Sequence, residues 1–483
     1  MQLHTFLSGH KLGSILVVGV IARVLLMPFS AHPFDVYVWY DTSLNIVRNG
    51  PLSVQAFPPL WGHYMMVPIA YVYDWLARVF SVGAIPMASL PSALDFYPSY
   101  NVKYVPGVLF NSVVKFPFLV SDVLVMLLLH KIVGEMTESK VLAEKAAFLW
   151  FLNPFLIWIS GGWGMWDTLP VLFSLACFFL LLKKKVVLSS VCLSLAVASK
   201  LYPALFLLPI TIYLLKTTLA GERLKNGVKF CSVFLAASLV LFLPYIGRAM
   251  GFFIGFFVPS PSGIAAVVAN PVVEPIGFGL TYWSLYLLNR LVNIPVSAGF
   301  VFLSFVVSGV LVVFSLTLTY WRISKLTFQK PFFDLVTAML LCVLALFLSY
   351  RIICEQWFVW ALPFLSIMCV GGRVKGAFYW GASLIALLYS VLNCPLPFFL
   401  LPLAPWIANT LLGMVYFSWT FEPIRIALLA ILGCLFSFLM LLVLLKLAGF
   451  ARSRIVSLRR RNYALKSTRC YARYSRPGII RDI

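Results

Sequence analysis

The stretch VVLSSVCLSLAVASKLYPALFLLPITIYLL (residues 186–215) decides the fold, because Lys200 divides it into two apolar runs. As a helix, the fourteen residues before Lys200 would span only about 21 Å, less than the roughly 30 Å of a hydrocarbon core. We therefore expect two helices that meet at or just below the outer interface of a membrane. An ionisable group at that depth is a functional candidate, and an ammonium facing a water-filled cavity suits a phosphate-bearing lipid ligand.

The composition of the whole chain indicates the same class of protein. Of its 483 residues, 62% are hydrophobic and 11% are charged, with a mean hydropathy of +0.98. This excludes a water-soluble globular protein and leaves a polytopic α-helical membrane protein. The formal charge of +22 does not indicate nucleic-acid binding, since ten of the 37 cations lie in a tail from Arg452 onwards. Such a tail is a topology signal and a contact for anionic membrane lipids.

The predicted topology follows from apolar segments and from the cations between them. Twelve segments are candidates for membrane spans: residues 12–29, 106–133, 145–160, 168–182, 186–199, 201–215, 230–246, 299–320, 332–349, 357–370, 376–393 and 425–449. The basic connections are 131–145, 183–185, 216–229, 322–330, 373–375 and the tail. With the N-terminus in the cytoplasm, all six fall on the cytoplasmic side, as the positive-inside rule requires. The sequence thus predicts an all-α polytopic protein of about twelve transmembrane helices with both termini cytoplasmic.

The chain is expected to form one transmembrane domain, residues 1–450, followed by a basic cytoplasmic tail, residues 451–483. Its longest outer loops are 31–105 and 247–298. The apolar stretch at 59–80 carries His63, Asp74 and Arg78, and a full span there would invert the orientation of every later loop. We therefore expect interfacial or re-entrant helices near 59–80.

Polar and aromatic side chains gather near the predicted outer ends of the spans. They are Asp35, Asp41, Trp163, Trp166, Asp167, Lys200, Arg351, Glu355 and Gln356. Transfer of a sugar from a lipid phosphate needs a carboxylate that takes the proton of an acceptor hydroxyl, and cations that hold the departing phosphate. We expect Asp35 to be the base, and Lys200 and Arg351 to stabilise the phosphate.

The acidic candidates also have structural interpretations. Asp35 and Asp41 are six residues apart, about 120° on a helix, so they do not form a carboxylate pair on one face. Both could cap a helix from Trp39 toward Val47, because aspartate favours helix N-termini. Asp167 could likewise cap the helix that continues through the following proline.

The aromatic and basic candidates leave similar alternatives open. Trp163 and Trp166 could stack on a sugar ring or belong to an interfacial aromatic belt. Arg351 and Glu355 are spaced i, i+4, so a local ion pair competes with a phosphate contact. Arg23 lies inside the first predicted span, where a buried guanidinium needs a carboxylate or phosphate partner that the sequence does not name.

Six motifs carry a resemblance to a known family. They are DVYVWYD at 35–41, PPLW at 58–61, KFPFLVSD at 115–122, LNP at 152–154, SKLYP at 199–203 and EQWFVW at 355–360. In this order and spacing they resemble the first-mannose glycosylphosphatidylinositol (GPI) mannosyltransferases, within the GT-C class of polytopic glycosyltransferases. SKLYP is similar to the family's Lys-Ile-Tyr-Pro signature, and EQWFVW to its late Ser-Gln-Tyr-Phe-Leu-Trp segment.

The resemblance implies a dolichyl- or other polyprenyl-phosphate mannose donor and an inverting transfer to a glycolipid or lipid-linked glycan. It implies a catalytic aspartate at Asp35 and substrate contacts at Lys200 and Tyr202. Where the family has Asp-x-Asp, this chain has Pro33-Phe34-Asp35, so a divalent cation (Mg²⁺ or Mn²⁺) stays an open cofactor and no metal ligand is assigned. A small accessory membrane subunit is among the partners considered.

The expected location is the plasma membrane of a prokaryote or the endoplasmic reticulum of a eukaryote. A twelve-span transporter or lipid flippase is the alternative function. Transporters usually contain two related halves, whereas the outer loops 31–105 and 247–298 differ in composition, which favours the enzyme.

Overall fold

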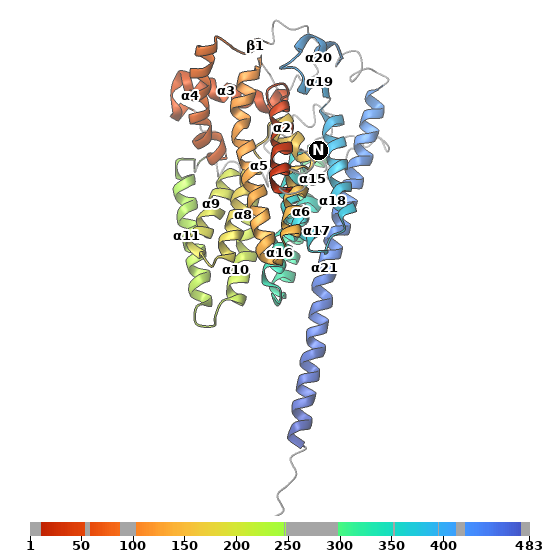
Figure 1. Cartoon of the computed structure of the whole chain (residues 1–483). Helices are drawn as coiled ribbons and strands as arrows, with labels where there is room; N and C mark the ends of the chain where they lie inside the picture. Colours follow the sequence, from red (N-terminus) through yellow and green to blue (C-terminus); the bar gives the residue numbers. More distant parts are fainter. Residues whose placement is uncertain are drawn as a thin grey trace, which may run out of the picture.

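The computed structural model describes residues 11–53, 58–86, 103–245, 247, 298–350, 353–394, 396–411 and 421–474. These residues are almost entirely helical (Figure 1). The exception is a short antiparallel ribbon of β1 (Ile85–Pro86) and β2 (Tyr104–Val105), in which Ile85 pairs with Val105. The predicted all-α class is confirmed.

The helices follow the apolar segments of the sequence. The first half of the chain forms α2 (Lys11–Leu26), α3 (Pro33–Asn49), α4 (Met66–Phe80), α5 (Val108–Thr137), α6 (Lys140–Phe151), α7 (Pro154–Ile157), α8 (Thr168–Leu182), α9 (Val186–Ser199), α10 (Leu207–Thr217) and α11 (Arg223–Phe242). The second half forms α15 (Ala298–Ser324), α16 (Pro331–Ser349), α17 (Leu362–Val370), α18 (Gly376–Asn393), α19 (Leu396–Phe399), α20 (Pro405–Leu411) and α21 (Glu422–Tyr474).

Short π- and 3₁₀-helical segments extend several of these helices. The π segments are η2 (Leu60–Met65) and η5 (Trp158–Trp163), and the 3₁₀ segments are η1 (Pro51–Ser53), η6 (Tyr202–Phe206), η7 (Leu243–Tyr245) and η8 (Glu355–Trp360). Eleven of the twelve predicted apolar segments coincide with one helix or with a helix and its short extension, and the segment 145–160 falls on α6, α7 and η5. The outer loop 247–298 and Arg351 fall outside the described residues, except for the loop's two end residues.

Six of the described helices are long and apolar enough to cross a membrane, and the bent pair of residues 140–163, with an angle of 46°, makes up to seven. The six lie at Val108–Thr137, Arg223–Tyr245, Val306–Ser324, Pro331–Ser349, Gly376–Asn393 and Pro423–Gly449. The helices α8, α9 and η6 with α10 are apolar but shorter. The chain is therefore a polytopic all-α membrane protein, but the predicted twelve spans are not shown, because helices of this length fall short of the hydrocarbon thickness.

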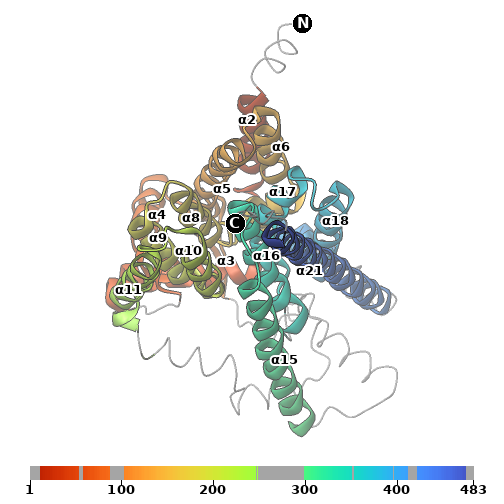
Figure 2. The same ribbon diagram turned by 90° about the horizontal axis from the view of Figure 1, so that it is seen from below.

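The helices form two groups joined by α5 and α6. Figure 2 shows α8, α9, α10 and α11 together on one side, and α16, α17, α18 and α21 on the other. Helix α5 packs on α6 and α8, and α17 packs on α6. The principal apolar core runs through both groups and includes Trp150, Phe178 and Phe358.

The basic connections meet at the end of the molecule from which α21 extends (Figure 1). Three contacts join them in pairs: Lys183 with Glu135, Lys216 with the carbonyl oxygen of Ser324 at 2.5 Å, and Arg373 with Asp334 at 3.3 Å. Lys184 of the connection 183–185 and Lys229 of the connection 216–229 line the same cavity, so these two connections are also neighbours. Five of the predicted cytoplasmic connections thus share one end, while the side of the membrane that this end faces stays a prediction.

The helices α3 and α4 lie at the opposite end (Figure 1). The segment η2 packs on α9, and α4 packs on α3 and α5, while the interfacial placement of residues 59–80 stays a prediction. Helix α3 begins six residues before the predicted start at Trp39. Pro33 opens it, and the Nδ1 atom of His32 caps it by accepting from the Asp35 N–H at 3.2 Å.

Arg23 has its carboxylate partner in Asp122. Its Nε atom lies 2.6 Å from Asp122 Oδ2, and both side chains are fully buried. The guanidinium also donates to the carbonyl oxygen of Phe151 at 2.9 Å, and Ser160 donates to Asp122 at 2.6 Å. This network joins α2, α5, α6 and η5.

We expect Asp122→Ala to lower the free energy of unfolding by about 3–5 kcal/mol, because it leaves the Arg23 guanidinium buried without its counter-charge. Thermal unfolding of the detergent-solubilised protein measures the loss. The matched control is Asp74→Ala, which removes an ion pair between Asp74 and Arg78. The side chain of Arg78 is 75% exposed and that of Asp74 is 31% exposed. Equal losses in the two variants would contradict a stabilising role for the buried pair.

Candidate functional site

The chain breaks at Lys200, as the sequence predicts. Helix α9 ends at Ser199, Lys200 has the extended conformation φ −165°, ψ 144°, and η6 begins at Tyr202. Residues 186–215 therefore do not form one continuous helix. At the break, the carbonyl oxygen of the buried Ser199 accepts from Trp166 Nε1 at 3.2 Å.

The Lys200 ammonium lies among a carboxylate and two indole rings. Its Nζ atom donates to Asp167 Oδ1 at 2.7 Å and lies 4.9 Å from the ring centre of Trp166 and 5.2 Å from that of Trp360. Ion pairing and the electron-rich faces of the rings stabilise the cation. The Lys200 side chain remains 16% exposed, whereas that of Asp167 is fully buried, so the ammonium is the part that a ligand can reach.

Asp167 orients this cation rather than capping a helix. It precedes α8, yet its side chain makes no capping hydrogen bond. Instead, its Oδ1 atom accepts from both Lys200 and Trp360 Nε1, the latter at 2.6 Å. Tyr202 stacks on Trp360, with 4.0 Å between the two ring centres. Asp167, predicted as a site residue, therefore contacts Lys200 directly, and Tyr202 stacks on a ring that lies beside it.

Asp35 is held in place by two neighbours. Its Oδ2 atom accepts from Trp163 Nε1 at 2.6 Å and lies 3.1 Å from His32 Nδ1. The imidazole of His32 stacks on Trp163, with 4.6 Å between ring centres and 6° between planes. Both contacts engage Oδ2, and the side chain keeps 22% of its surface exposed, so Oδ1 is available to a substrate hydroxyl.

The chemistry of His32 and Trp163 follows from their burial. Burial lowers the pKa of His32, although the Asp35 charge opposes the shift, so we expect a neutral imidazole whose Nδ1 accepts from the Asp35 N–H. Trp163 is 4% exposed, with one face covered by His32 and its N–H used by Asp35. It therefore supports the carboxylate and does not lie in an exposed aromatic belt.

A buried lysine joins the two elements that carry Asp35 and Trp163. The Nζ atom of Lys115, in α5, donates to the carbonyl oxygens of Met27 and Ser30 before α3, and of Gly161 and Gly162 in η5. The side chain is fully buried. These four bonds fix the start of α3 against η5, which sets the position of Asp35.

Glycine is required next to this lysine. Gly164 has φ +93°, and a Cβ atom there would lie 2.7 Å from Lys115 Cε and 3.0 Å from Val36 Cγ2. A side chain would therefore meet both an unfavourable backbone conformation and a steric clash.

Three carboxyl groups share this region. Glu355, in η8, is 3% exposed and accepts from Asn393 Nδ2. Burial raises its pKa to about 7, and the charge of Asp35 adds to the shift. Burial also raises the pKa of Asp167, against the attraction of Lys200, and Asp35 raises it further. Asp35 thus lies within electrostatic reach of both carboxyl groups.

The remaining predicted residues lie apart or outside the description. Asp41, which we predicted among the substrate-binding residues, is exposed and accepts from Asn45 Nδ2 at 3.2 Å. It does not pair with Asp35, as their 120° separation predicts. Gln356 is 8% exposed beside Glu355. Because Arg351 is not described, its expected pairing with Glu355 is untested.

Three residues of the site were not predicted from the sequence. His32 preceded a proline and carried no helix signal, and Asn393 ended an apolar segment. Trp360 lies in the EQWFVW motif, five residues after Glu355, so its place in that motif could have marked it as a site residue. Among the described residues, no group of three or more His, Cys, Asp or Glu side chains could hold a metal ion.

Parts of the chain are similar to proteins that are named for GPI. Residues 94–254 match the family described as GPI transamidase subunit PIG-U. A segment of 104 residues, 21% of the chain, is 35% identical to GPI mannosyltransferase 1 of Candida albicans. A segment of 105 residues, also 21% of the chain, is 30% identical to GPI mannosyltransferase 1 of Debaryomyces hansenii. Each segment spans 25% of the yeast protein.

Proposed function

We propose that this protein is an integral-membrane glycosyltransferase of the GPI pathway. It transfers a sugar, expected to be mannose, from a dolichyl- or polyprenyl-phosphate donor to a glycolipid or lipid-linked glycan. The observation that carries the proposal is the position of Asp35, a fixed and partly exposed carboxylate on α3. Trp39 of the same helix packs against Trp166, the ring beside the Lys200 ammonium that Asp167 holds. The similarity to two GPI mannosyltransferases supports the choice of sugar.

The proposed reaction is a single displacement. The acceptor hydroxyl donates its proton to Asp35 Oδ1 while its oxygen attacks the anomeric carbon of the donor sugar. The bond from that carbon to the phosphate oxygen breaks, and its electron pair leaves with the polyprenyl phosphate. Lys200, with Arg351 as a further expected cation, stabilises the negative charge on this leaving group. Attack from the side opposite the phosphate inverts the anomeric centre.

The surrounding side chains have positioning roles in this scheme. Trp163 donates to the Asp35 carboxylate and fixes it, while His32 stacks on Trp163 and caps α3 by accepting from the Asp35 N–H. Asp167 directs the Lys200 ammonium. The stacked rings of Tyr202 and Trp360 restrict the motion of that ammonium and cover the carboxylate beneath it. Trp166 supplies a ring face beside the cation, where a sugar could stack.

The membrane setting belongs to the same proposal. It comprises twelve apolar helices, cytoplasmic termini, and a reaction on the extracytoplasmic side, with the endoplasmic reticulum as the location in a eukaryote. Membrane lipids and a small accessory subunit are the further partners. Dependence on Mg²⁺ or Mn²⁺ stays open and is tested by transfer assays with and without a chelator.

The family match supports a second candidate, a transamidase-type subunit that binds a GPI glycan without transferring sugar. The matched range contains Asp167, Lys200 and Tyr202 but neither Asp35 nor Glu355. The chain also has Pro33 where the mannosyltransferases that it resembles have an acid. In this candidate the same ammonium would bind a phosphate of the GPI glycan.

We expect Asp35→Asn to lower sugar transfer by about 100-fold or more, because the amide takes no proton from the acceptor hydroxyl. Purified protein, radiolabelled dolichyl-phosphate mannose and GPI precursor lipids provide the measurement. Asp41→Asn is the matched control, since it lies on the same helix and is exposed. Full transfer by Asp35→Asn would remove the proposed base. Absence of transfer by the unmodified protein, together with binding of GPI glycans, would favour the second candidate.

The pH dependence of transfer is expected to follow the pKa of Glu355, which burial raises to about 7. Below this pH the carboxyl group is protonated and neutral. Above it, a new negative charge beside Asp35 and Asp167 opposes the anionic donor, so we expect kcat/KM to fall several-fold as the pH rises through about 7. Glu355→Gln keeps this position neutral and should remove the fall. Coincident pH profiles for the two proteins would show that another group is responsible.

A further inference from the structure

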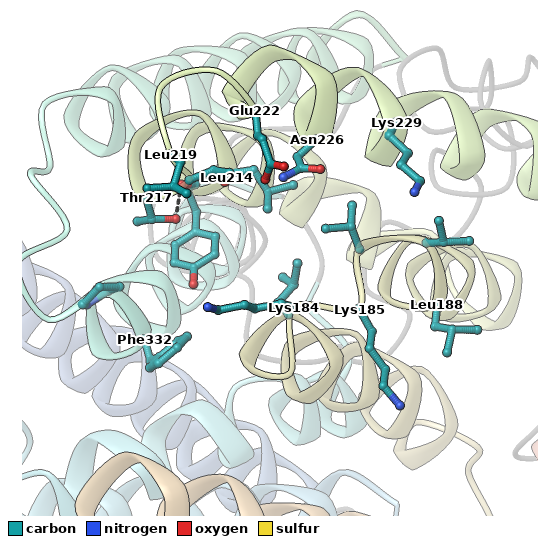
Figure 3. A pocket seen from close by; sticks show the side chains of 16 residues that line it. Lys184, Lys185, Leu188, Leu214, Thr217, Leu219, Glu222, Asn226, Lys229 and Phe332 are labelled. Atoms are coloured by element: carbon teal, nitrogen blue, oxygen red, sulfur yellow. Dashed lines mark hydrogen bonds between the residues drawn. The ribbon is translucent and has the colours of Figure 1, made fainter.

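A cavity of about 830 Å³ lies at the end of the molecule opposite Asp35 (Figure 3). It is formed by the α8–α9 turn, the α10–α11 turn and the start of α16. Tyr213, Leu214 and Phe332 contribute to its apolar wall, and Lys184, Lys185 and Lys229 contribute its cations. In Figure 3, Lys184 extends toward Phe332, and Lys229 extends from α11 toward Leu188.

The lysines of this cavity are available to an anion. The ammonium groups of Lys184, Lys185 and Lys229 form no hydrogen bond or ion pair with any residue that the structure describes. Glu222 is the one acid among the lining residues, so the lining carries three positive charges and one negative charge. The cavity therefore has a net positive charge that no described side chain compensates.

Helix N-termini add to the positive potential. Helix α9 begins at Val186 and α11 at Arg223, and neither has a side-chain cap. Val186, Val187 and Leu188, the first turn of α9, line the cavity, as does Asn226 of α11. The free backbone N–H groups of a first helical turn bind phosphate well, because the helix dipole places partial positive charge there.

The edge of the cavity is apolar and exposed. Leu188 and Leu219 line it with 52% and 78% of their surfaces exposed, and Leu224 near the start of α11 is 72% exposed. A free phosphate ion would leave this apolar rim exposed to water, whereas the acyl chains of a lipid would cover it. The cavity lies at the ends of apolar helices, where headgroups and acyl chains meet.

We infer that this cavity is a binding site for the phosphate headgroup of an anionic membrane phospholipid. The phosphate lies at the first turn of α9 between Lys184 and Lys229, with Lys185 directed away from these two, and the acyl chains run along the exposed leucines at the rim. The site is separate from the proposed transferase centre, which lies beyond the opposite ends of α9 and α16. Its occupancy therefore does not depend on whether the protein transfers sugar.

Titration of the full-length protein in detergent with phosphatidic acid, followed by native mass spectrometry, tests the inference. We expect the triple variant Lys184→Ala, Lys185→Ala, Lys229→Ala to lower the affinity roughly tenfold or more, since each cation near a headgroup contributes on the order of 1 kcal/mol. The matched control is Lys131→Ala, Lys140→Ala, Lys225→Ala, which removes the same charge from the same end but spares the cavity. We expect less than about a threefold change for it.

Further measurements separate the site from general charge and from free phosphate. Lys229→Glu, a single change at an exposed position, should also weaken lipid binding and guards against misfolding of the triple variant. Competition by inorganic phosphate in the unmodified protein would show that the phosphate group is what the cavity recognises. Equal losses of affinity in the two triple variants would show that the cavity is not the binding site. Binding of inorganic phosphate without any binding of phosphatidic acid would show that the ligand is not a lipid.

Discussion

The buried amino group of Lys115 is the constraint on which the end of the molecule that carries Asp35 depends. A cation in an apolar interior is costly unless donors and acceptors surround it, and four carbonyl oxygens from two separate segments do so here. The α2–α3 connection and η5 must therefore come together at α5. This single requirement places His32, Asp35 and Trp163 within contact of one another.

Local patterns predicted the helices well, because hydrophobicity and helix breaks are properties of neighbouring residues. All twelve apolar segments form helices, the chain breaks at Lys200, and the segment near 59–80 is helical. The number of spans could not be predicted in the same way. Short helices such as α8 and α9 pack on one another, so their lengths do not have to match the membrane.

Contacts between residues far apart in the chain could not be predicted from the sequence. Asp122 lies 99 positions after Arg23, and nothing in either local context connects them. Asp167 illustrates a different limit, since its sequence suits a helix cap but Trp360 and Lys200 offer its carboxylate stronger, charge-assisted bonds. Helical geometry did predict that Asp41 would point away from Asp35, because that relation depends on residues of one helix alone.

The contact between Gly164 and Lys115 has a consequence for how this sequence can change. A side chain at position 164 needs the space that the lysine methylenes occupy, and a shorter residue at position 115 would leave four carbonyl oxygens in the interior without their donor. Neither position can be altered first without a loss of stability. The glycine and the lysine therefore constrain the same small volume, and a change at either position requires that the surroundings of both be rebuilt.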